Sequence, residues 1–161
     1  MNLDALGNLG DLLGGIGVIA TLLYLAAQIR TNTREVRSAS LHALTVIHLE
    51  FQRAVWQDAE LTRIWFDGLS GDAPLAEADG RRFMFMLISA ARQWETAYRN
   101  TRGGSLESSE WAGMHLELTR TFAAKGALPY WSEIRKDGFP QDFVEYAEKA
   151  VQKRLSEQAA A

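Results

Sequence analysis

The sequence predicts an all-α protein, with an N-terminal transmembrane helix followed by a cytosolic bundle of about five helices. Apolar residues recur at spacings of three and four over long stretches, which is the period of a helix face, and no stretch alternates as a half-buried strand does. The chain has only three prolines, Pro74, Pro129 and Pro140, and each lies in or beside a turn-like stretch. Its 161 residues are enough for one domain with a sizeable core.

Composition excludes several classes of function. The formal net charge is -3, which argues against a general nucleic-acid binder, because such proteins carry a basic face. The chain contains no cysteine, so disulfides, thiolate zinc sites, cysteine-ligated iron–sulfur clusters and cysteine nucleophiles are excluded. The absence of cysteine is also consistent with a reducing compartment.

The first element is the apolar segment at residues 12–29, the centre of a span predicted over about residues 10–30. It carries no charged residue, and as a helix it measures roughly 27 Å, close to the thickness of a bilayer core. The polar groups within it are only Thr21, Tyr24 and Gln28. Two interpretations remain open, a membrane span and a buried central helix of a soluble bundle.

Charges on the two sides of this segment favour the membrane and indicate an orientation. Asp4 and Asp11 precede it, whereas Arg30, Arg34 and Arg37 follow it within one helix face. Because positive residues stay on the cytoplasmic side, we expect the N-terminus outside and the C-terminal domain inside. The arginines also have the sign that attracts anionic lipid headgroups, so membrane lipids are predicted partners. A cleaved signal peptide is not expected, because its basic residues precede the apolar run.

Small residues form one face of the same segment. Gly10 and Gly14 make a GxxxG pair, and Gly17 and Thr21 continue along the same side of the helix. Such faces let two helices approach closely within a membrane. The pattern therefore predicts a homo-oligomer or a place in a larger membrane protein complex.

The segment after residue 30 is predicted to be a second helix. It either continues directly from the first or begins after a soft break at Thr31 to Thr33, where Asn32 and Glu35 have the spacing of a capping box. Its apolar seam contains one histidine and consists of Leu41, Leu44, His48, Phe51 and Val55. Residues 67–80, rich in Gly, Asp and Pro, form the clearest loop.

The remaining helices follow from their seams and breakers. Phe83 to Ile88 is apolar all round, so the helix that contains it should be the most buried one of the domain. The predicted inward-facing residues are Phe83, Leu87, Ala90, Trp94 and Ala97; then Trp111, His115, Leu118 and Phe122; and finally Phe143, Ala147, Ala150 and Val151. A short helix begins near Pro129. The predicted organisation is an N-terminal segment at 1–30, a helical domain at 31–157 and a frayed tail at 158–161.

No residue pattern predicts catalysis, a cofactor or a metal. A P-loop, a dinucleotide fingerprint and a nucleophile elbow are all missing, and the helical Glu-x-x-His metal signature does not occur. Arg92, Glu95 and Arg99 have the spacing of opposite-charge pairs on the most apolar helix. We interpret Glu95 as a structural buried ion pair rather than a proton-handling group, and His48, Arg92 and Glu95 as candidates for a buried polar network.

One stretch, TLLYLAAQIRTNTREVR, resembles the start of a widespread group of small uncharacterised bacterial proteins. In that group an apolar helix ends in a Tyr-Leu-Ala-x-Gln-Ile-Arg-x-Asn-Thr pattern, and an Arg-x-x-Glu, a Gly turn and two Trp positions follow. The corresponding residues here are Tyr24 through Thr33, Arg92 and Glu95, Gly103, Trp111 and Trp131. The resemblance covers most of the chain and implies a membrane-associated bacterial helical protein, hence the bacterial inner membrane, but it implies no activity.

These observations together predict a structural or interaction module, either a homo-oligomer or an accessory subunit of a membrane complex, and not an enzyme. One alternative is an oligomeric ion-conducting pore, with Gly14, Gly17 and Thr21 around the axis and Asp11 at its mouth. Another is a soluble ligand-binding helical bundle that uses His48, Glu95 or His115 in a core pocket.

Overall fold

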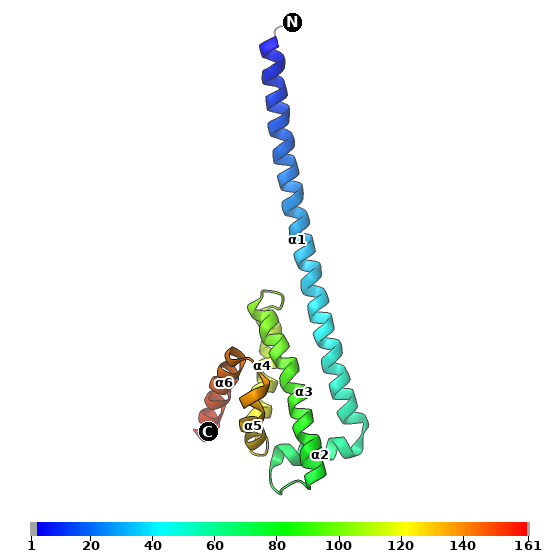
Figure 1. Ribbon diagram of the computed structural model, residues 1–161, viewed down its shortest axis with the longest axis vertical. Coiled ribbons are helices and arrows are strands. Elements are labelled where there is room, and N and C mark those ends of the chain that lie inside the picture. Colours follow the sequence, from blue (N-terminus) through cyan, green and yellow to red (C-terminus); the bar gives the residue numbers. More distant parts are fainter. Residues whose placement is uncertain (1–2, 161) are drawn as a thin grey trace. The chain divides into compact units, whose positions relative to one another are not determined.

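The computed structural model describes the backbone of residues 3–160 and the side-chain surroundings of residues 13–136 and 138–160 (Figure 1). Over these residues the chain is helical and contains no strand, which confirms the predicted all-α class. The helices are α1 (Leu3–Gln57), α2 (Ala59–Ser70), α3 (Glu77–Arg102), α4 (Ser108–Phe122), α5 (Leu128–Gly138) and α6 (Gln141–Ala159).

The chain divides into two compact units, Met1–Ala39 and Ser40–Ala161. The first unit is the N-terminal part of α1 and contains the predicted segment at residues 1–30. The second unit holds the end of α1 and the other five helices. The tail predicted to fray from residue 158 is helical as far as Ala159.

Helix α1 continues through Thr31 to Thr33, where the sequence left a soft break open. The hydroxyl of Thr31 donates to the carbonyl of Ala27 at 3.2 Å, and that of Thr33 donates to the carbonyl of Ile29 at 2.8 Å. The hydroxyl groups of both threonines are thus hydrogen-bonded within the helix. The stretch also contains no glycine or proline that would end the helix. Asn32 therefore caps no new helix.

A break at Asp58, which was not predicted from the sequence, divides the predicted second helix into α1 and α2. The Asp58 carboxylate accepts hydrogen bonds from the backbone amides of Glu60 at 2.8 Å and Leu61 at 3.0 Å. This is an N-cap, which satisfies amides that have no partner within the helix. The second unit therefore contains the end of α1 plus five helices, one more helical segment than the count of about five.

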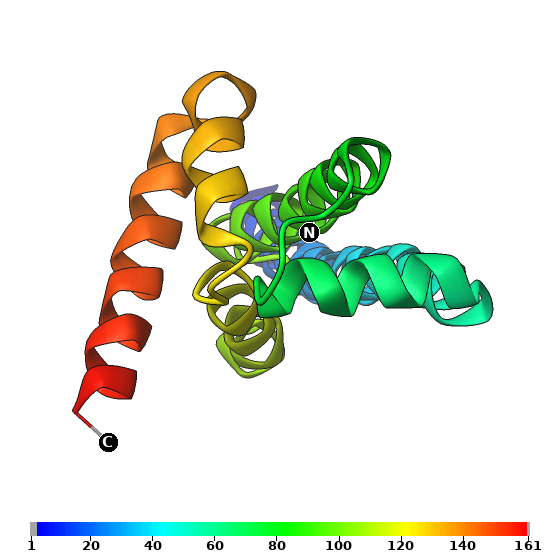
Figure 2. The same cartoon turned by 90° about the horizontal axis from the view of Figure 1, so that it is seen from below.

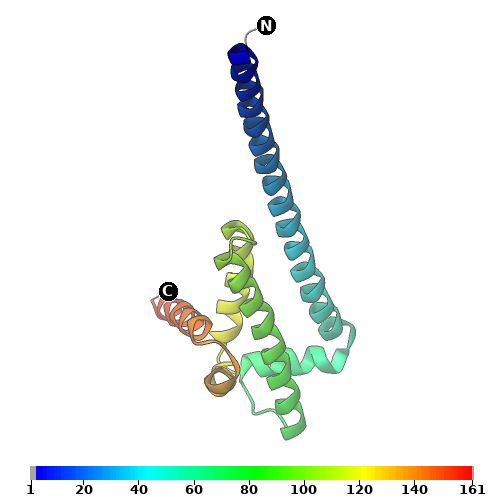
Figure 3. The same cartoon turned by 45° about the horizontal axis from the view of Figure 1, so that its top comes forward.

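The helices of the second unit pack around α3. Helix α4 runs back along α3 after a tight turn, and α2 crosses α3 at a steep angle (Figures 1 and 3). Helices α5 and α6 lie side by side, with an ion pair between Arg135 and Glu148 (Figure 2). The predicted short helix at Pro129 is α5, with the proline in its first turn.

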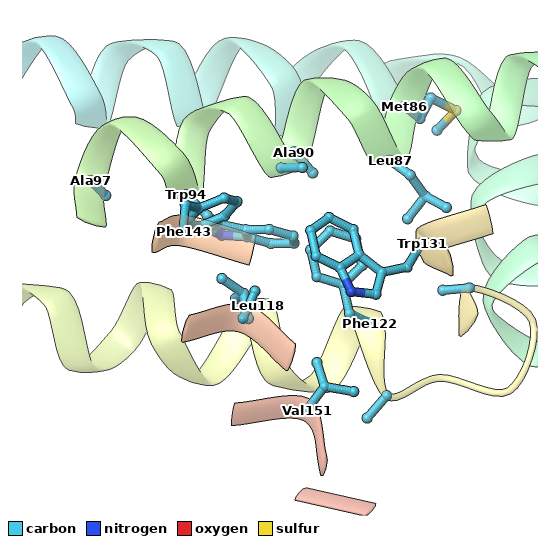
Figure 4. Packing of buried hydrophobic residues seen from close by; sticks show 14 of the residues in the cluster. Met86, Leu87, Ala90, Trp94, Ala97, Leu118, Phe122, Trp131, Phe143 and Val151 are labelled. Atoms are coloured by element: carbon cyan, nitrogen blue, oxygen red, sulfur yellow. The ribbon is translucent and has the colours of Figure 1, made fainter. Parts of the chain in front are cut away.

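The core takes buried residues from the end of α1 and from α2 to α6, and Figure 4 shows the part that lies between α3, α4, α5 and α6. Its largest fully buried side chains are Phe83, Phe122, Phe143, Ile64, Leu87 and Leu118. The ring of Trp131 stacks on Phe122 at a centroid distance of 4.2 Å, and Trp94 meets Phe122 edge-on at 5.2 Å. Aromatic contacts of this kind add about 0.5–1.5 kcal/mol to the burial of the rings. The buried residues thus follow the seams predicted from spacing, with five seam residues only half-buried: Leu41, His48, Phe51, His115 and Ala150.

Helix α3 supplies the most buried residues, as expected, but its apolar stretch is not buried on every side. Phe83 and Leu87 are fully buried, whereas Phe85 is 64% exposed. The difference arises because α3 packs against α2, α4 and α5 and leaves one direction facing solvent.

Two glycines hold the α4–α5 turn against the end of α2. The amide of Gly126 donates to the carbonyl of Leu69 at 3.1 Å. A Cβ atom at Gly126 would collide with the carbonyl oxygen of Gly68, so no side chain fits there. Gly71 ends α2 with a φ of 61°, a left-handed conformation that favours glycine.

Candidate functional site

The first candidate site is the apolar surface of residues 13–29 in the first unit. Every residue in this segment is exposed, and its large side chains are between 47% and 67% exposed. These side chains are Leu13, Ile16, Val18, Ile19, Leu22, Leu23, Tyr24, Leu25 and Ile29. Helix α1 is long enough and apolar enough to cross a membrane. An exposed apolar surface of this extent marks a membrane or protein interaction site.

The predicted small-residue face lies within this surface. A Cβ atom added at Gly14 or Gly17 would meet nothing within 4 Å. The Thr21 hydroxyl donates to the Gly17 carbonyl at 2.8 Å, so it is satisfied within the helix. Gly10 and Asp11 belong to α1, but their surroundings lie outside the described residues. The face has room for a second helix at Gly14 and Gly17.

The three arginines predicted to set the topology follow this surface directly. Arg30, Arg34 and Arg37 are exposed on α1, and none forms an ion pair with another residue in the described ranges. Their charges are therefore available to an external anion such as a lipid phosphate.

The second candidate site is a cavity of about 500 Å³ within the unit Ser40–Ala161. Its volume falls in the range of small-molecule sites, and most of its wall is apolar. Four helices supply its lining: His48, Phe51, Gln52, Val55 and Trp56 of α1; Trp65, Phe66 and Leu69 of α2; Ala90, Gln93 and Trp94 of α3; and Glu117, Arg120 and Thr121 of α4.

The inner wall of the cavity is made of aromatic rings that are fixed by core contacts. Phe51 meets Trp65 edge-on at a centroid distance of 5.7 Å, and Trp94 is held by Phe122. The outer wall differs, because Trp56 is 66% exposed and Phe66 is 57% exposed. The cavity thus has a rigid aromatic interior and an apolar mouth open to solvent.

A polar group on one wall joins α1 to α4. The side-chain amide of Gln52 donates to Nε2 of His48 at 2.8 Å, which leaves the ring proton on Nδ1. A carboxylate oxygen of Glu117 lies 3.6 Å from the same nitrogen. His48 therefore lines the cavity with Gln52 and Glu117, and it does not join Arg92 and Glu95.

Three further polar side chains line the cavity without a partner. Arg120, Gln93 and Thr121 make no side-chain hydrogen bond or ion pair with any of the residues the structure describes. The guanidinium and the amide are strong donors, and the hydroxyl both donates and accepts. None of the three was singled out from the sequence, because their positions show no motif and only the packing of four helices brings them together.

Glu95 lies elsewhere, in an ion-pair cluster on α3. It is 8% exposed, and its oxygens lie 2.8 Å from Nη1 of Arg92 and 3.1 Å from Nε of Arg99. The Arg92 guanidinium also sits 4.3 Å from the centroid of the Phe139 ring. Both carboxylate oxygens are thus engaged by cations that remain in water, an arrangement suited to structural support.

His115 belongs to a separate chain of hydrogen bonds between α4 and α6. Nε1 of Trp111 donates to the Tyr146 hydroxyl at 3.0 Å, and that hydroxyl lies 2.9 Å from Nδ1 of His115. The Tyr146 hydroxyl thus links the indole of Trp111 to the imidazole of His115. Burial, followed by the nearby charge of Lys153, lowers the pKa of His115 below its ordinary value of 6.5.

Metal ligands do not gather in the part of the chain that the structure describes, since no group of three His, Asp or Glu side chains there has the geometry to hold an ion. Of the three histidines, His42 is exposed on α1, while His48 and His115 belong to the two networks above.

Comparison with known proteins adds no relative. No family model matches the chain, and neither a curated protein nor a solved structure matches it.

Proposed function

We propose that the chain is a single-pass protein of the bacterial inner membrane whose helical domain serves as a structural or interaction module. In this proposal residues 13–29 cross the bilayer, and the unit Ser40–Ala161 lies in the cytoplasm. The observation that carries the proposal is the exposure of every side chain in residues 13–29, a segment that contains no charge. If they stayed in water, each large apolar side chain would lose the stabilising free energy of burial, about 1.5–3 kcal/mol.

The distribution of these side chains around the helix supports a span over a surface-lying helix. Successive residues of a helix differ by about 100° in direction, so Leu22, Leu23 and Leu25 point to three different sides. A helix that lies in the membrane interface needs one strongly polar face. The polar side of this segment holds only Thr21, Tyr24 and Gln28, none of them charged. The segment therefore suits surroundings that are apolar on all sides.

The flanking charges support the orientation. Arg30, Arg34 and Arg37 follow the segment and have no partner among the described residues, which suits the cytoplasmic headgroup region. The free space at Gly14 and Gly17 supports association through this helix, either with a second copy or with a subunit of a larger membrane complex.

The membrane proposal is tested by resistance to alkaline carbonate extraction. The full-length chain should remain in the membrane pellet, and the double variant Ile19→Lys with Leu22→Lys should move to the soluble or aggregated fraction. Each buried lysine near the centre of a span costs about 2.5–3.5 kcal/mol. The matched control is Leu49→Lys with Leu116→Lys, at two exposed leucines of the second unit, which should behave as the wild type. Complete extraction of the wild type, together with a monodisperse species in plain buffer, would overturn the proposal.

Association is tested separately by native mass spectrometry from mild detergent. Gly17→Leu fills the small-residue face and should reduce a discrete oligomer to the monomer. Gly113→Leu is the control, because Gly113 also has nothing within 4 Å of its Cβ position but lies on α4. An unchanged oligomer in Gly17→Leu would place the contact elsewhere, and a monomeric wild type would favour a partner subunit.

A further inference from the structure

We propose that the cavity between α1, α2, α3 and α4 binds an uncharged, flat aromatic molecule of one or two rings. All residues that line the cavity belong to the unit Ser40–Ala161, so this site does not depend on membrane insertion. The proposal follows from the volume of the cavity, the angle between two rings on its wall, and the presence of both signs of charge on one side.

The volume of the cavity limits the size of the ligand. About 500 Å³ lies within the range of small-molecule sites and accommodates a molecule of one or two rings. Most of the wall is apolar, so the burial of apolar ligand surface drives binding. At the mouth, Trp56 is 66% exposed and Phe66 is 57% exposed, and both rings would lose contact with water when a ligand covers them. The body of the ligand is therefore apolar.

Two rings on the wall distinguish an aromatic ligand from an aliphatic one. Phe51 and Trp65 both line the cavity, with centroids 5.7 Å apart and planes 77° from each other. Trp65 also packs against the fully buried Phe83 at a centroid distance of 5.8 Å, so binding need not order its ring. Aromatic pairs prefer offset-stacked or edge-to-face geometry. A flat ring between Phe51 and Trp65 can stack on one and meet the other edge-on, whereas a saturated ring gains neither contact.

The charged groups on the wall favour a ligand without charge. Glu117 and Arg120 lie three residues apart on α4, and both line the cavity. His48 does not neutralise Glu117, because Nε2 of the imidazole accepts a hydrogen bond from Gln52 and carries no proton for the carboxylate 3.6 Å away. An acidic head would meet Glu117, a basic head would meet Arg120, and either would lose its own hydration. An uncharged hydroxyl loses less, and the amide of Gln93 can hydrogen-bond to it.

The test compares four probes with the same double-ring skeleton. Naphthalenemethanol is uncharged and aromatic, decahydronaphthalenemethanol is its saturated counterpart, and naphthoate and naphthylmethylammonium carry a negative and a positive charge. Each is titrated calorimetrically at neutral pH into the full-length protein in lipid nanodiscs, and empty nanodiscs are titrated in parallel to subtract partition into lipid. We expect naphthalenemethanol to bind about fivefold tighter than the saturated alcohol, because ring–ring contacts add to burial. Both charged probes should bind at least about threefold weaker than naphthalenemethanol.

Two exposed phenylalanines provide a matched pair of variants that assign the site. Phe66 lines the mouth of the cavity, whereas Phe85, which is 64% exposed on α3, is not among the lining residues. Phe66→Leu should reduce the preference for the aromatic alcohol about twofold and leave the affinity for the saturated alcohol nearly unchanged. Phe85→Leu should change neither affinity. Ala90→Leu fills the cavity and should weaken both alcohols in a sample whose second unit still unfolds cooperatively.

Four results would each overturn the proposal. In the first, naphthalenemethanol does not bind the wild type above the empty-nanodisc level. In the second, the saturated alcohol binds as tightly as the aromatic one. In the third, a charged probe binds more tightly than naphthalenemethanol, which would assign the cavity to ions of that sign. In the fourth, Phe66→Leu keeps the full aromatic preference, as Phe85→Leu does, which would place binding on another surface. None of these results bears on the membrane span, which carbonate extraction tests.

Discussion

Two apolar stretches of this chain have similar composition and opposite surroundings. In α3, Phe83 and Leu87 are fully buried among α2, α4 and α5. In residues 13–29 of α1, Leu22 and Leu23 are 60% and 67% exposed. The difference lies in the polar residues rather than the apolar ones. Helix α3 carries charged residues, such as Arg81 and Arg92, on its solvent side, whereas residues 13–29 have no charged side at all. A helix with one polar side covers a core, and a helix without one needs an apolar medium on all sides.

The largest expected effect contrasts one leucine from each stretch. Leu87→Ala should lower the free energy of unfolding by about 2–5 kcal/mol, because it leaves a cavity at a fully buried site. Leu23→Ala should leave that free energy unchanged. The measurement is denaturant unfolding in mild detergent followed by tryptophan fluorescence, since all five tryptophans lie in the second unit. Equal losses in the two variants would mean that residues 13–29 pack against protein.

A glycine pair sharpens the same contrast. Gly126→Ala should destabilise the second unit by about 1–3 kcal/mol, because the new methyl group would collide with the carbonyl of Gly68. Gly15→Ala meets nothing within 4 Å and should leave the unfolding of the second unit unaltered. Thermal unfolding of both variants by circular dichroism checks this. A stable Gly126→Ala would show that the α4–α5 turn can move away from α2.

The buried carboxylate of α3 gives a smaller effect. Glu95→Gln should cost about 1–2 kcal/mol, since the amide weakens two charged hydrogen bonds while both arginines stay hydrated. Glu77→Gln removes a comparable but exposed pair with Arg81 and should have no measurable effect. Denaturant midpoints at low and high salt separate the two, because salt screens only the exposed pair strongly. No loss in Glu95→Gln would mean that desolvation cancels the ion pairs.

The smallest effect is the pH dependence that arises from His115. Its folded pKa lies below the unfolded value of about 6.5, so the unfolded chain binds the proton more readily. The stability is complete above pH 6.5 and declines as pH falls from there toward the lowered pKa, by at most about 1.4 kcal/mol per pH unit. His115→Gln should flatten this part of the stability profile. A profile that keeps the same slope in the variant would assign the pH dependence to other groups.

Local patterns predicted the helices better than the boundaries between them. The seams from Leu41 to Val55 and from Phe83 to Ala97 were visible because helical spacing is a property of neighbouring residues. The break at Asp58 was missed because it lies inside a stretch without glycine or proline. The available signal was the Asp58 carboxylate followed by Glu60 in the first turn of α2.

The candidate cavity was predicted only through one of its members. His48 stood out as a histidine within an apolar seam, but its contacts with Gln52 and Glu117 depend on how α1 packs on α4. Arg120 belongs to no sequence motif, and only the packing of the helices places it at the cavity. The hydrogen bond from Trp111 to Tyr146 likewise joins α4 to α6, and no sequence spacing indicates it.

The sequence by itself determined the all-α class, the seams that become the core and the uncharged apolar segment at residues 12–29. These follow from composition and spacing, which act within a few turns of one helix. Only the tertiary structure decided which aromatic rings stay uncovered, which carboxylate lies beside His48 and that Arg120 lines the cavity. Those outcomes depend on contacts between residues far apart in the chain, where packing space and electrostatic pairing are settled jointly by several helices.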